Sequence, residues 1–314
     1  MVDDKEIKAT ISPFICCRGE IKKFDGKDGY VSMNQIIHKI NLGHITEIHF
    51  KIIEIINKFE FITSRQLFQL LTVKEIPDEI KSQDKLNDRL EQLVKTKILT
   101  RYYFTSEKGD CIYRVYCLEK MGKYLLDSRG IECKWQPTDN TKPVSMIKKR
   151  LVGNQIILAY LRKVKNFSSY IIKPSITAKK SGKTFKVMGC GITLEKEGKK
   201  AHFIFETIRR EEEWETKFVE RLSFYKDFYE SFMIMDSGYD KMPQLIIVCE
   251  DDKHMAECFR ILVTKEIQIE QIKYYFTTDL KQNEEKLDKS LTEFKLDEVT
   301  KKYKMEIIEA KILG

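Results

Sequence analysis

The chain of 314 residues is poor in proline and glycine, with six and 14 respectively. This shortage argues against long disordered linkers, which are usually rich in these residues. No stretch approaches the roughly 20 apolar residues that a membrane-spanning helix needs. Residues 1–5 also lack the charge order of a signal peptide, and no apolar run follows them. We therefore expect a cytoplasmic protein that makes no contact with a membrane.

Cysteine and histidine are too dispersed to indicate a metal site. Zinc ligands normally occur at short spacings, but no two cysteines form a C-x-x-C pair and the five histidines are scattered. The adjacent Cys16 and Cys17 could form a redox pair only through a strained disulfide. We expect reduced and mostly buried thiols, no metal and no cofactor. The other cysteines are Cys111, Cys117, Cys133, Cys190, Cys249 and Cys258.

Positive charge is concentrated in the middle of the chain. The whole chain has a net charge of +8, whereas residues 144–200 contain 14 lysines and arginines and two acidic residues, a net charge of +12. Such a concentration creates a field that attracts phosphate backbones. It therefore favours a nucleic acid as the partner. The length of the chain is typical of two domains, each with its own core.

Residues 44–134 have the pattern of a small DNA-binding domain. Apolar residues recur at helical spacing over 48–56. A second helix is predicted after Thr63, an N-cap residue with Gln66 as its capping-box partner. A third helix is predicted over 84–97, because leucines and a valine follow one of its faces.

A hairpin follows these three helices. The segments 98–105 and 111–118 are strand-like, and residues 106–110 form a turn between them. Three helices followed by a two-stranded hairpin is the order of a winged helix, in which the third helix enters the major groove and the hairpin lies along the DNA backbone.

This domain offers side chains of the kinds that read DNA. Asn and Gln can pair with adenine, and Arg with guanine. Three acidic residues on the third helix, Asp84, Asp88 and Glu91, would repel phosphate. A solvated helix face and a protein-binding role therefore remain alternatives. The residues predicted to contact DNA are Arg65, Lys85, Asn87, Arg89, Gln92, Lys95, Arg101, Lys108 and Arg114.

The flanking segments carry weaker signals. Residues 1–43 contain short alternating patterns, two glycine turns and a short predicted helix over 31–40, and they indicate no function. Residues 135–143 are polar with two prolines, and we expect a linker there. The charged extension 281–314 could be a helix with a strand or a dimerisation tail.

Residues 144–280 alternate between helical and strand-like patterns, an order typical of an α/β domain with a mixed sheet. Helices are predicted over 145–165, 213–232 and 254–264, and strands over 170–172, 185–194, 201–208, 244–249 and 274–278. Six basic residues are predicted to hold the DNA backbone: Lys148, Lys149, Arg150, Lys179, Lys180 and Lys183. The loop around Lys183 lacks the P-loop pattern, which excludes that kind of nucleotide site.

The order of these segments resembles the replication-relaxation family of plasmids and other mobile elements. The matching stretches are 61–67, 89–99, 116–126, 203–206, 217–225 and 243–248, within about residues 45–280. The resemblance implies a winged helix-turn-helix followed by a restriction-endonuclease-like mixed sheet with flanking helices. It also implies a role in plasmid replication, relaxation or transfer.

Nucleases with that core carry one acidic residue on a strand and D/E-x-K on the next, and the carboxylates hold a divalent metal. Glu206 ends the corresponding strand here, but Thr207 and Ile208 follow it, and no acidic residue occurs in 188–191. We therefore expect an inactive nuclease-like domain in which Glu206 is structural, paired with Arg209 or Arg210. The alternative is a metal-dependent endonuclease or nickase that uses Glu206.

The sequence thus predicts a non-enzymatic protein that binds specific double-stranded DNA sites for replication, transfer or transcriptional control. We expect a homodimer, since such proteins commonly read paired sites. A further alternative is an adaptor that binds a relaxase or a replication protein.

Overall fold

The computed structural model describes residues 11–26, 28–73, 78–178, 182–234, 238–267, 274–283, 287–296 and 303–309. Contacts divide the chain into an N-terminal unit, residues 17–154, and a C-terminal unit formed by residues 155–314 together with the segment that ends at Cys16. The division falls within helix α6 (Val144–Lys163). Both units combine helices and strands, so the predicted mixed α and β class is confirmed.

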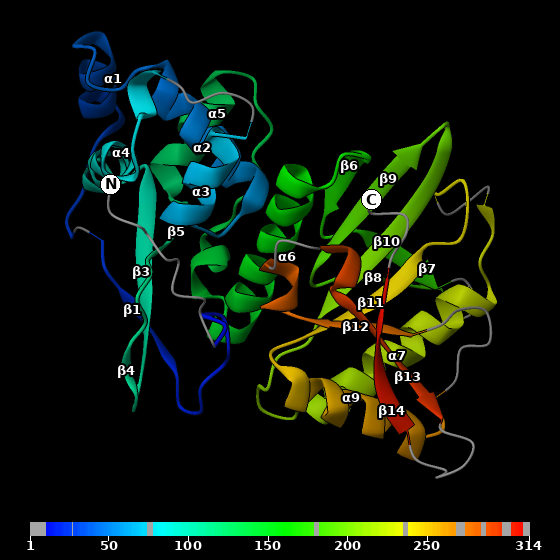
Figure 1. Cartoon of the computed structure of the whole chain (residues 1–314). Helices are drawn as coiled ribbons and strands as arrows, with labels where there is room; N and C mark the ends of the chain where they lie inside the picture. The colour runs from blue at the N-terminus through cyan, green and yellow to red at the C-terminus, as the bar shows by residue number, and fades with distance from the viewer. Residues whose placement is uncertain are drawn as a thin grey trace, which may run out of the picture. The chain divides into compact units, whose positions relative to one another are not determined.

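The N-terminal unit begins with a strand and continues with helices before its hairpin (Figure 1). Its strands are β1 (Ile21–Phe24), β2 (Ile62–Thr63), β3 (Leu99–Ser106), β4 (Gly109–Asp110) and β5 (Val115–Leu118). Its helices before α6 are α1 (Met33–Asn41), α2 (Glu47–Phe59), α3 (Ser64–Leu71), α4 (Gln83–Lys95) and α5 (Lys120–Ser128), with the 3-10 turns η1 (Asp78–Ile80) and η2 (Pro137–Thr141).

Local sequence explains where α3 and α4 begin. The Thr63 side chain accepts the backbone N–H of Gln66, whose own side chain accepts the N–H of Thr63, so the predicted capping box is confirmed. Ser82 caps α4 in the same way by accepting the N–H of Lys85. The leucines of α4 are buried, as its apolar spacing predicted.

The hairpin belongs to a small antiparallel sheet with the strand order β1-β3-β5-β2, and β4 pairs with the end of β3. Residues 107 and 108 form a two-residue turn between Ser106 and Gly109. Gly109 has a φ of 99°, a conformation that glycine adopts without strain. Strand β1 lies beside β3, so part of the segment 1–43 extends this sheet.

The segment expected to be a linker is integrated into the N-terminal unit. Residues 135–143 contain η2, and Lys142 and Asn140 accept hydrogen bonds at their carbonyl oxygens from the Lys22 ammonium group. Farther along α6, Asn154 donates to the carbonyl oxygen of Phe61 at 2.7 Å. These contacts attach the first half of α6 to the N-terminal unit.

The C-terminal unit contains a seven-stranded sheet with the order β14-β13-β12-β11-β10-β9-β6. Its strands are β6 (Phe167–Ile172), β9 (Cys190–Lys196), β10 (Lys199–Thr207), β11 (Gln244–Cys249), β12 (Tyr275–Thr278), β13 (Leu291–Leu296) and β14 (Tyr303–Ile308). Strands β10, β11 and β12 are parallel, and the other neighbours are antiparallel. The mixed sheet was predicted, and β13 and β14 add the charged extension to it.

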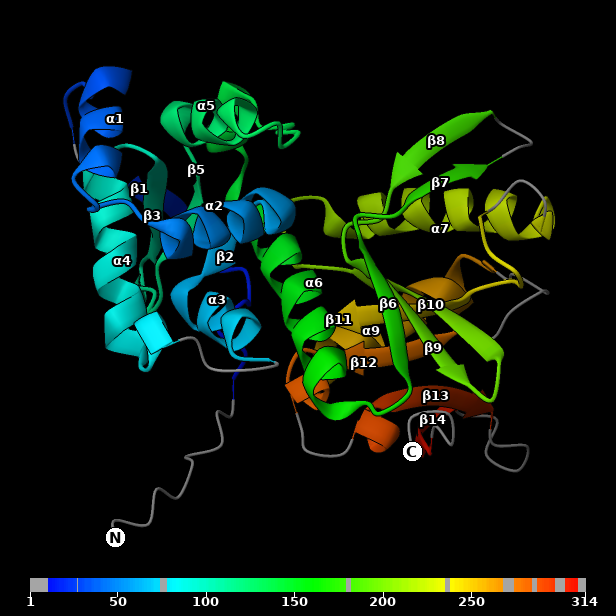
Figure 2. The ribbon, with the colours of Figure 1, turned by 90° about the horizontal axis from the view of Figure 1, so that it is seen from above.

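Helices cover both faces of this sheet. Tyr160 of α6 packs edge-on against Phe205 on one face, with ring centroids 5.5 Å apart. On the other face, α7 (Trp214–Glu230) and α9 (Asp252–Thr264) bury a core that includes Phe218, Leu222 and Met255. A separate hairpin of β7 (Ser175–Ala178) and β8 (Lys183–Lys186) lies against α7 (Figure 2).

Among the described residues, no helix combines the length and the apolar character that crossing a membrane requires. The 3-10 turns η3 (Lys281–Asn283) and η4 (Leu287–Lys289) complete the C-terminal unit as far as it is described.

Candidate nucleic-acid interface

Helix α4 presents one polar face away from its leucines. Lys85, Asn87 and Lys95 are exposed on it, and Arg89 is half-buried. Asn87 accepts a hydrogen bond from Gln83 at 3.1 Å. Lys95 pairs with Glu91 at 3.5 Å. Lys85 and Arg89 are one helical turn apart and lie on the same side of α4, whereas Asn87 lies on the opposite flank of the polar face.

Four of the predicted cations form no salt bridge with a carboxylate within the described part of the chain. They are Arg65 on α3, Lys85 and Arg89 on α4, and Lys108 at the hairpin turn. Arg89 also lowers the pKa of the buried His49, after the larger effect of burial itself. An exposed cation without an acidic neighbour is available to a phosphate.

Gln92 has a different role from the predicted one. Its amide oxygen lies 3.1 Å from Nε2 of His49, and its amide nitrogen donates to the carbonyl oxygen of His44 at 2.6 Å. Both amide atoms therefore hold α4 against α2 and the segment before it. Reading an adenine edge would need both atoms, so Gln92 leaves the predicted DNA-contacting set.

Two arginines of the hairpin are held by acidic residues. Arg101 lies 2.6 Å from Glu91 and 3.2 Å from Asp25, and Arg114 lies 2.5 Å from the same Asp25 carboxylate. Arg114 also stacks over the Tyr103 ring at 4.6 Å. Asp25 directly follows β1, which sequence reasoning did not place beside the hairpin. These pairs reduce the charge that Arg101 and Arg114 can offer to DNA.

Lys148 and Arg150 are buried, which corrects their predicted role as backbone contacts. The Lys148 side chain is 2% exposed, and its ammonium group lies 2.6 Å from both carboxylate oxygens of Glu20. The Arg150 side chain is 3% exposed and lies 3.8 Å from Glu60. Lys149, between them, is half-buried. Two of these three cations cannot reach a DNA backbone from these positions.

The basic window 144–200 is divided between the two units. Residues up to 154 belong to the N-terminal unit and the others to the C-terminal unit. Lys183 is exposed at the start of β8. The predicted contacts Lys179 and Lys180 lie outside the described residues. Other exposed cations of the window are Arg162, Lys163, Lys165, Lys186, Lys196, Lys199 and Lys200.

One exposed lysine near the hairpin was missed. Lys23 lies on β1 opposite Tyr103 of β3, and its side chain is exposed. The short alternating patterns of residues 1–43 were compatible with added strands, but nothing local to the sequence showed that one of them would join the hairpin.

Glu206 is buried on β10 and has partners other than the predicted ones. Arg221 of α7 donates to its carboxylate at 3.1 Å, and the Tyr225 hydroxyl donates at 2.5 Å. Arg209 and Arg210, the predicted partners, bind other carboxylates. Within the described residues, no three His, Cys, Asp or Glu side chains are grouped so that they could hold a metal ion. Glu206 therefore packs α7 onto the sheet.

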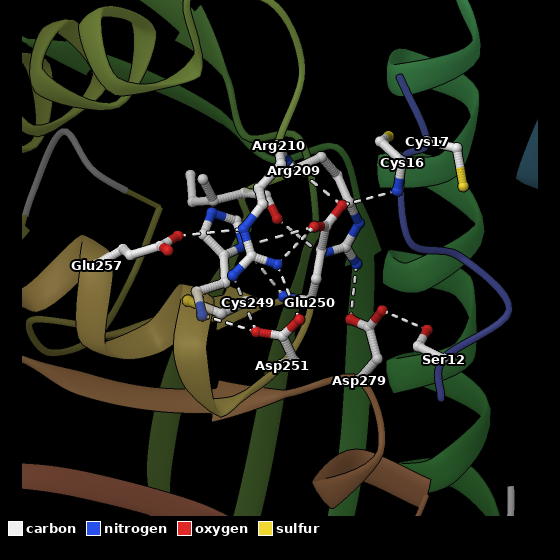
Figure 3. Close-up of polar contacts among 12 residues, drawn as sticks. Ser12, Cys16, Cys17, Arg209, Arg210, Cys249, Glu250, Asp251, Glu257 and Asp279 are labelled. Atoms are coloured by element: carbon white, nitrogen blue, oxygen red, sulfur yellow. Dashed lines mark hydrogen bonds and ion pairs between the residues drawn. The ribbon is translucent and has the colours of Figure 1, made fainter. Parts of the chain in front are cut away.

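An ion network, buried around Arg209 and Asp279 and partly exposed around Arg210, occupies the carboxyl ends of the parallel strands β10, β11 and β12 (Figure 3). Arg209 lies 2.7 Å from Asp279, which also accepts the Ser12 hydroxyl at 2.6 Å. Arg210 pairs with Asp251 at 2.8 Å and with Glu257 at 3.1 Å. Ligands often bind at this edge of a parallel sheet, but here the charged side chains bind one another.

Burial governs protonation in this network. It raises the pKa of Asp279 and of Glu250, and the nearby arginines oppose that rise. Burial, followed by the charges of Arg210 and Arg209, lowers the pKa of His254 to about 3. Nδ1 of His254 accepts the backbone N–H of Glu250 at 3.3 Å, so the ring is held neutral.

The buried His254 makes the C-terminal unit sensitive to acid. Its folded-state pKa lies below the unfolded value of about 6.5, so stability is complete above pH 6.5 and decreases as pH falls toward 3. Between pH 6.5 and 5 we expect a loss of about 1.5 kcal/mol in the free energy of unfolding. Urea unfolding of the wild type and of His254→Gln, which keeps an acceptor, measures it. An identical pH dependence in both proteins would contradict the assignment.

Comparisons with protein-family models, with curated proteins and with solved structures find no significant match. The resemblance to the replication-relaxation family therefore stays a prediction that rests on the sequence stretches alone.

Proposed function

We propose that the chain is a non-enzymatic protein that binds specific sites on double-stranded DNA through a winged helix in its N-terminal unit. The order of α2, β2, α3, α4 and the β3–β5 hairpin supports this proposal, because it is the element order of that motif. In this assignment α4 enters the major groove, and the turn that contains Lys108 lies along the backbone.

The observation that carries the proposal is the polar face of α4. Lys85 and Arg89 are one helical turn apart, and neither forms a salt bridge within the described part of the chain, unlike Arg101 and Arg114. Arg89 can read guanine, and Asn87 can pair with adenine. Asp84 and Asp88 remain on the same helix and limit how closely it approaches phosphate.

Burial of Lys148 and Arg150 reduces the expected dependence of binding on salt. If Arg65, Lys85 and Lys108 neutralise about three phosphates while Arg89 reads a base, affinity should fall about 40-fold between about 50 and 200 mM salt. Fluorescence anisotropy with a duplex obtained by selection from random fragments measures this slope. An affinity that does not change with salt, or no selected fragment at all, would contradict the proposal.

Two variants distinguish recognition of a specific DNA sequence from electrostatic attraction to any duplex. Arg89→Ala should relax the choice of site and weaken the selected duplex by about 1–3 kcal/mol. Lys108→Ala should weaken all duplexes alike. Gln92→Ala is a control for helix placement, because its amide contacts lie within the protein. We expect it to lower stability and to leave site preference unchanged in the folded fraction.

The wider biological role is proposed on the resemblance alone. It suggests a plasmid or another mobile element and a task in replication, relaxation, transfer or transcriptional control. An adaptor that binds a relaxase or a replication protein is the second candidate, and it would be favoured by co-purification of such a protein without DNA binding. Cleavage of supercoiled plasmid with Mg²⁺ that is lost in Glu206→Gln would instead favour the nuclease alternative.

A further inference from the structure

Strand β14 forms one end of the seven-stranded sheet (Figure 2). It pairs with β13 on one side, from Leu291 opposite Ile308 to Leu296 opposite Tyr303. On its other side, no strand of the described residues pairs with it. An edge of this kind presents backbone N–H and C=O groups that a further strand can bind.

The same strand exposes apolar side chains. Met305 is 50% exposed and Ile307 is 65% exposed, and both point to one face because they alternate along the strand. Met305 lies opposite Phe294 of β13, which is half-buried and stacks on Phe259 of α9 with ring centroids 4.0 Å apart. An apolar face that is covered over β13 thus continues onto β14, where it is exposed.

The charges of β14 select one partner and one register. A two-fold axis perpendicular to the sheet would pair β14 antiparallel with its own copy and place residues of the same face opposite each other. If Met305 lies on that axis, Lys304 faces Glu306 of the copy on both sides of it, and Tyr303 faces Ile307. Centring on Lys304 or on Glu306 instead would place each of these charges opposite itself, which is destabilising.

We propose that β14 is a self-association surface, in which two copies of this chain join their sheets through antiparallel β14 strands centred on Met305. This pairing satisfies the exposed backbone N–H and C=O groups of both edges and brings Met305 beside Met305 of the copy. Glu306 already lies 2.7 Å from Lys295 of its own chain, so the second lysine would share that carboxylate. The inference does not depend on DNA binding.

A contact between two six-residue strands is small compared with a standard interface of about 1,600 Å². We therefore expect a reversible dimer that forms at micromolar concentrations. Sedimentation equilibrium of the full chain measures its dissociation constant. A protein that stays monomeric up to about 100 µM, where a micromolar dimer would predominate, would overturn the proposal.

Two opposite charge reversals test the register. In Lys304→Glu, the new glutamate should face Glu306 of the copy on both sides of the axis. In Glu306→Lys, the new lysine should likewise face Lys304 of the copy. Each change should raise the dissociation constant about tenfold or more. A mixture of the two variants should form a heterodimer as tight as the wild-type dimer, because every facing pair again has opposite charges.

The mixture distinguishes a lost contact from a folding defect, because two misfolded chains would not restore each other. Lys253→Glu, an exposed charge reversal on α9, is the matched control and should dimerise normally. Met305→Cys should also form a disulfide dimer on mild oxidation above the background of the native cysteines, whereas Lys304→Cys should not, since only residue 305 faces itself. Undiminished dimers in Lys304→Glu, or no rescue in the mixture, would overturn the proposal.

Discussion

Replacing Asp279 with alanine should reduce the free energy of unfolding of the C-terminal unit by about 3–5 kcal/mol. Asp279 is 4% exposed and accepts one hydrogen bond from Arg209 at 2.7 Å and another from Ser12 at 2.6 Å. The Arg209 side chain is completely buried. Removal of the Asp279 carboxylate therefore leaves the Arg209 guanidinium as a charge that water cannot reach. That desolvation accounts for the size of the effect.

Each unit contains one of the two tryptophans, which allows their unfolding to be followed separately. Trp214 begins α7, whereas Trp135 lies in the N-terminal unit. Denaturant unfolding of Asp279→Ala in a Trp135→Phe background reports the C-terminal unit. Lys226→Ala breaks an exposed pair with Glu230 at 3.8 Å and should change stability by less than about 1 kcal/mol. Equal effects of the two variants would contradict the argument.

The second large effect is expected from Lys148→Ala, which should destabilise the N-terminal unit by about 3–5 kcal/mol. The Glu20 carboxylate is 7% exposed and accepts Lys148 through both oxygens, so the variant leaves it as a buried charge. The Lys148 ammonium group also lies 5.5 Å above the Phe104 ring, and that contact is lost as well. A Trp214→Phe background isolates the signal of Trp135 for this measurement.

Stability and DNA affinity should respond to different lysines. Lys85→Ala on the exposed face of α4 should weaken DNA binding and change stability by less than about 0.5 kcal/mol. Lys148→Ala, measured where it is still folded, should bind DNA as the wild type does. The double variant Glu20→Leu/Lys148→Met should recover most of the lost stability, because a well-packed apolar pair can replace a buried ion pair. Loss of DNA binding in folded Lys148→Ala would restore the phosphate-contact role predicted from sequence.

Local patterns predicted most helices and strands, but the strand predicted over 185–194 was wrong, because this stretch is divided between β8 and β9, which belong to different sheets. Thr63 and Gln66 are three residues apart, and the helix that they begin has the predicted capping box. The buried run 244–249 is the strand β11, as its unbroken apolar character predicted. Each of these features depends on neighbours within a few residues, so the sequence alone contains the relevant physics.

The roles of the charged residues could not be predicted in the same way. Lys148 and Lys149 are adjacent and chemically identical, but only Lys148 meets Glu20, which lies 128 positions away in the chain. The position of Asp25 between Arg101 and Arg114 likewise depends on β1 joining a distant strand. Burial and pairing of such groups follow from long-range topology, which a single sequence does not reveal.

The C-terminal unit is completed by residues from the start of the chain. Ser12 donates to Asp279, and the backbone N–H of Cys16 donates to Glu250 at 2.8 Å. On the ribosome, residues 17–154 emerge as one continuous piece and can fold first. The opening segment must then wait until Asp279 has been synthesised before these two hydrogen bonds form. A protein made without its first sixteen residues should therefore fold its N-terminal unit normally. In its C-terminal unit, the buried carboxylates of Asp279 and Glu250 would each lack one hydrogen-bond donor.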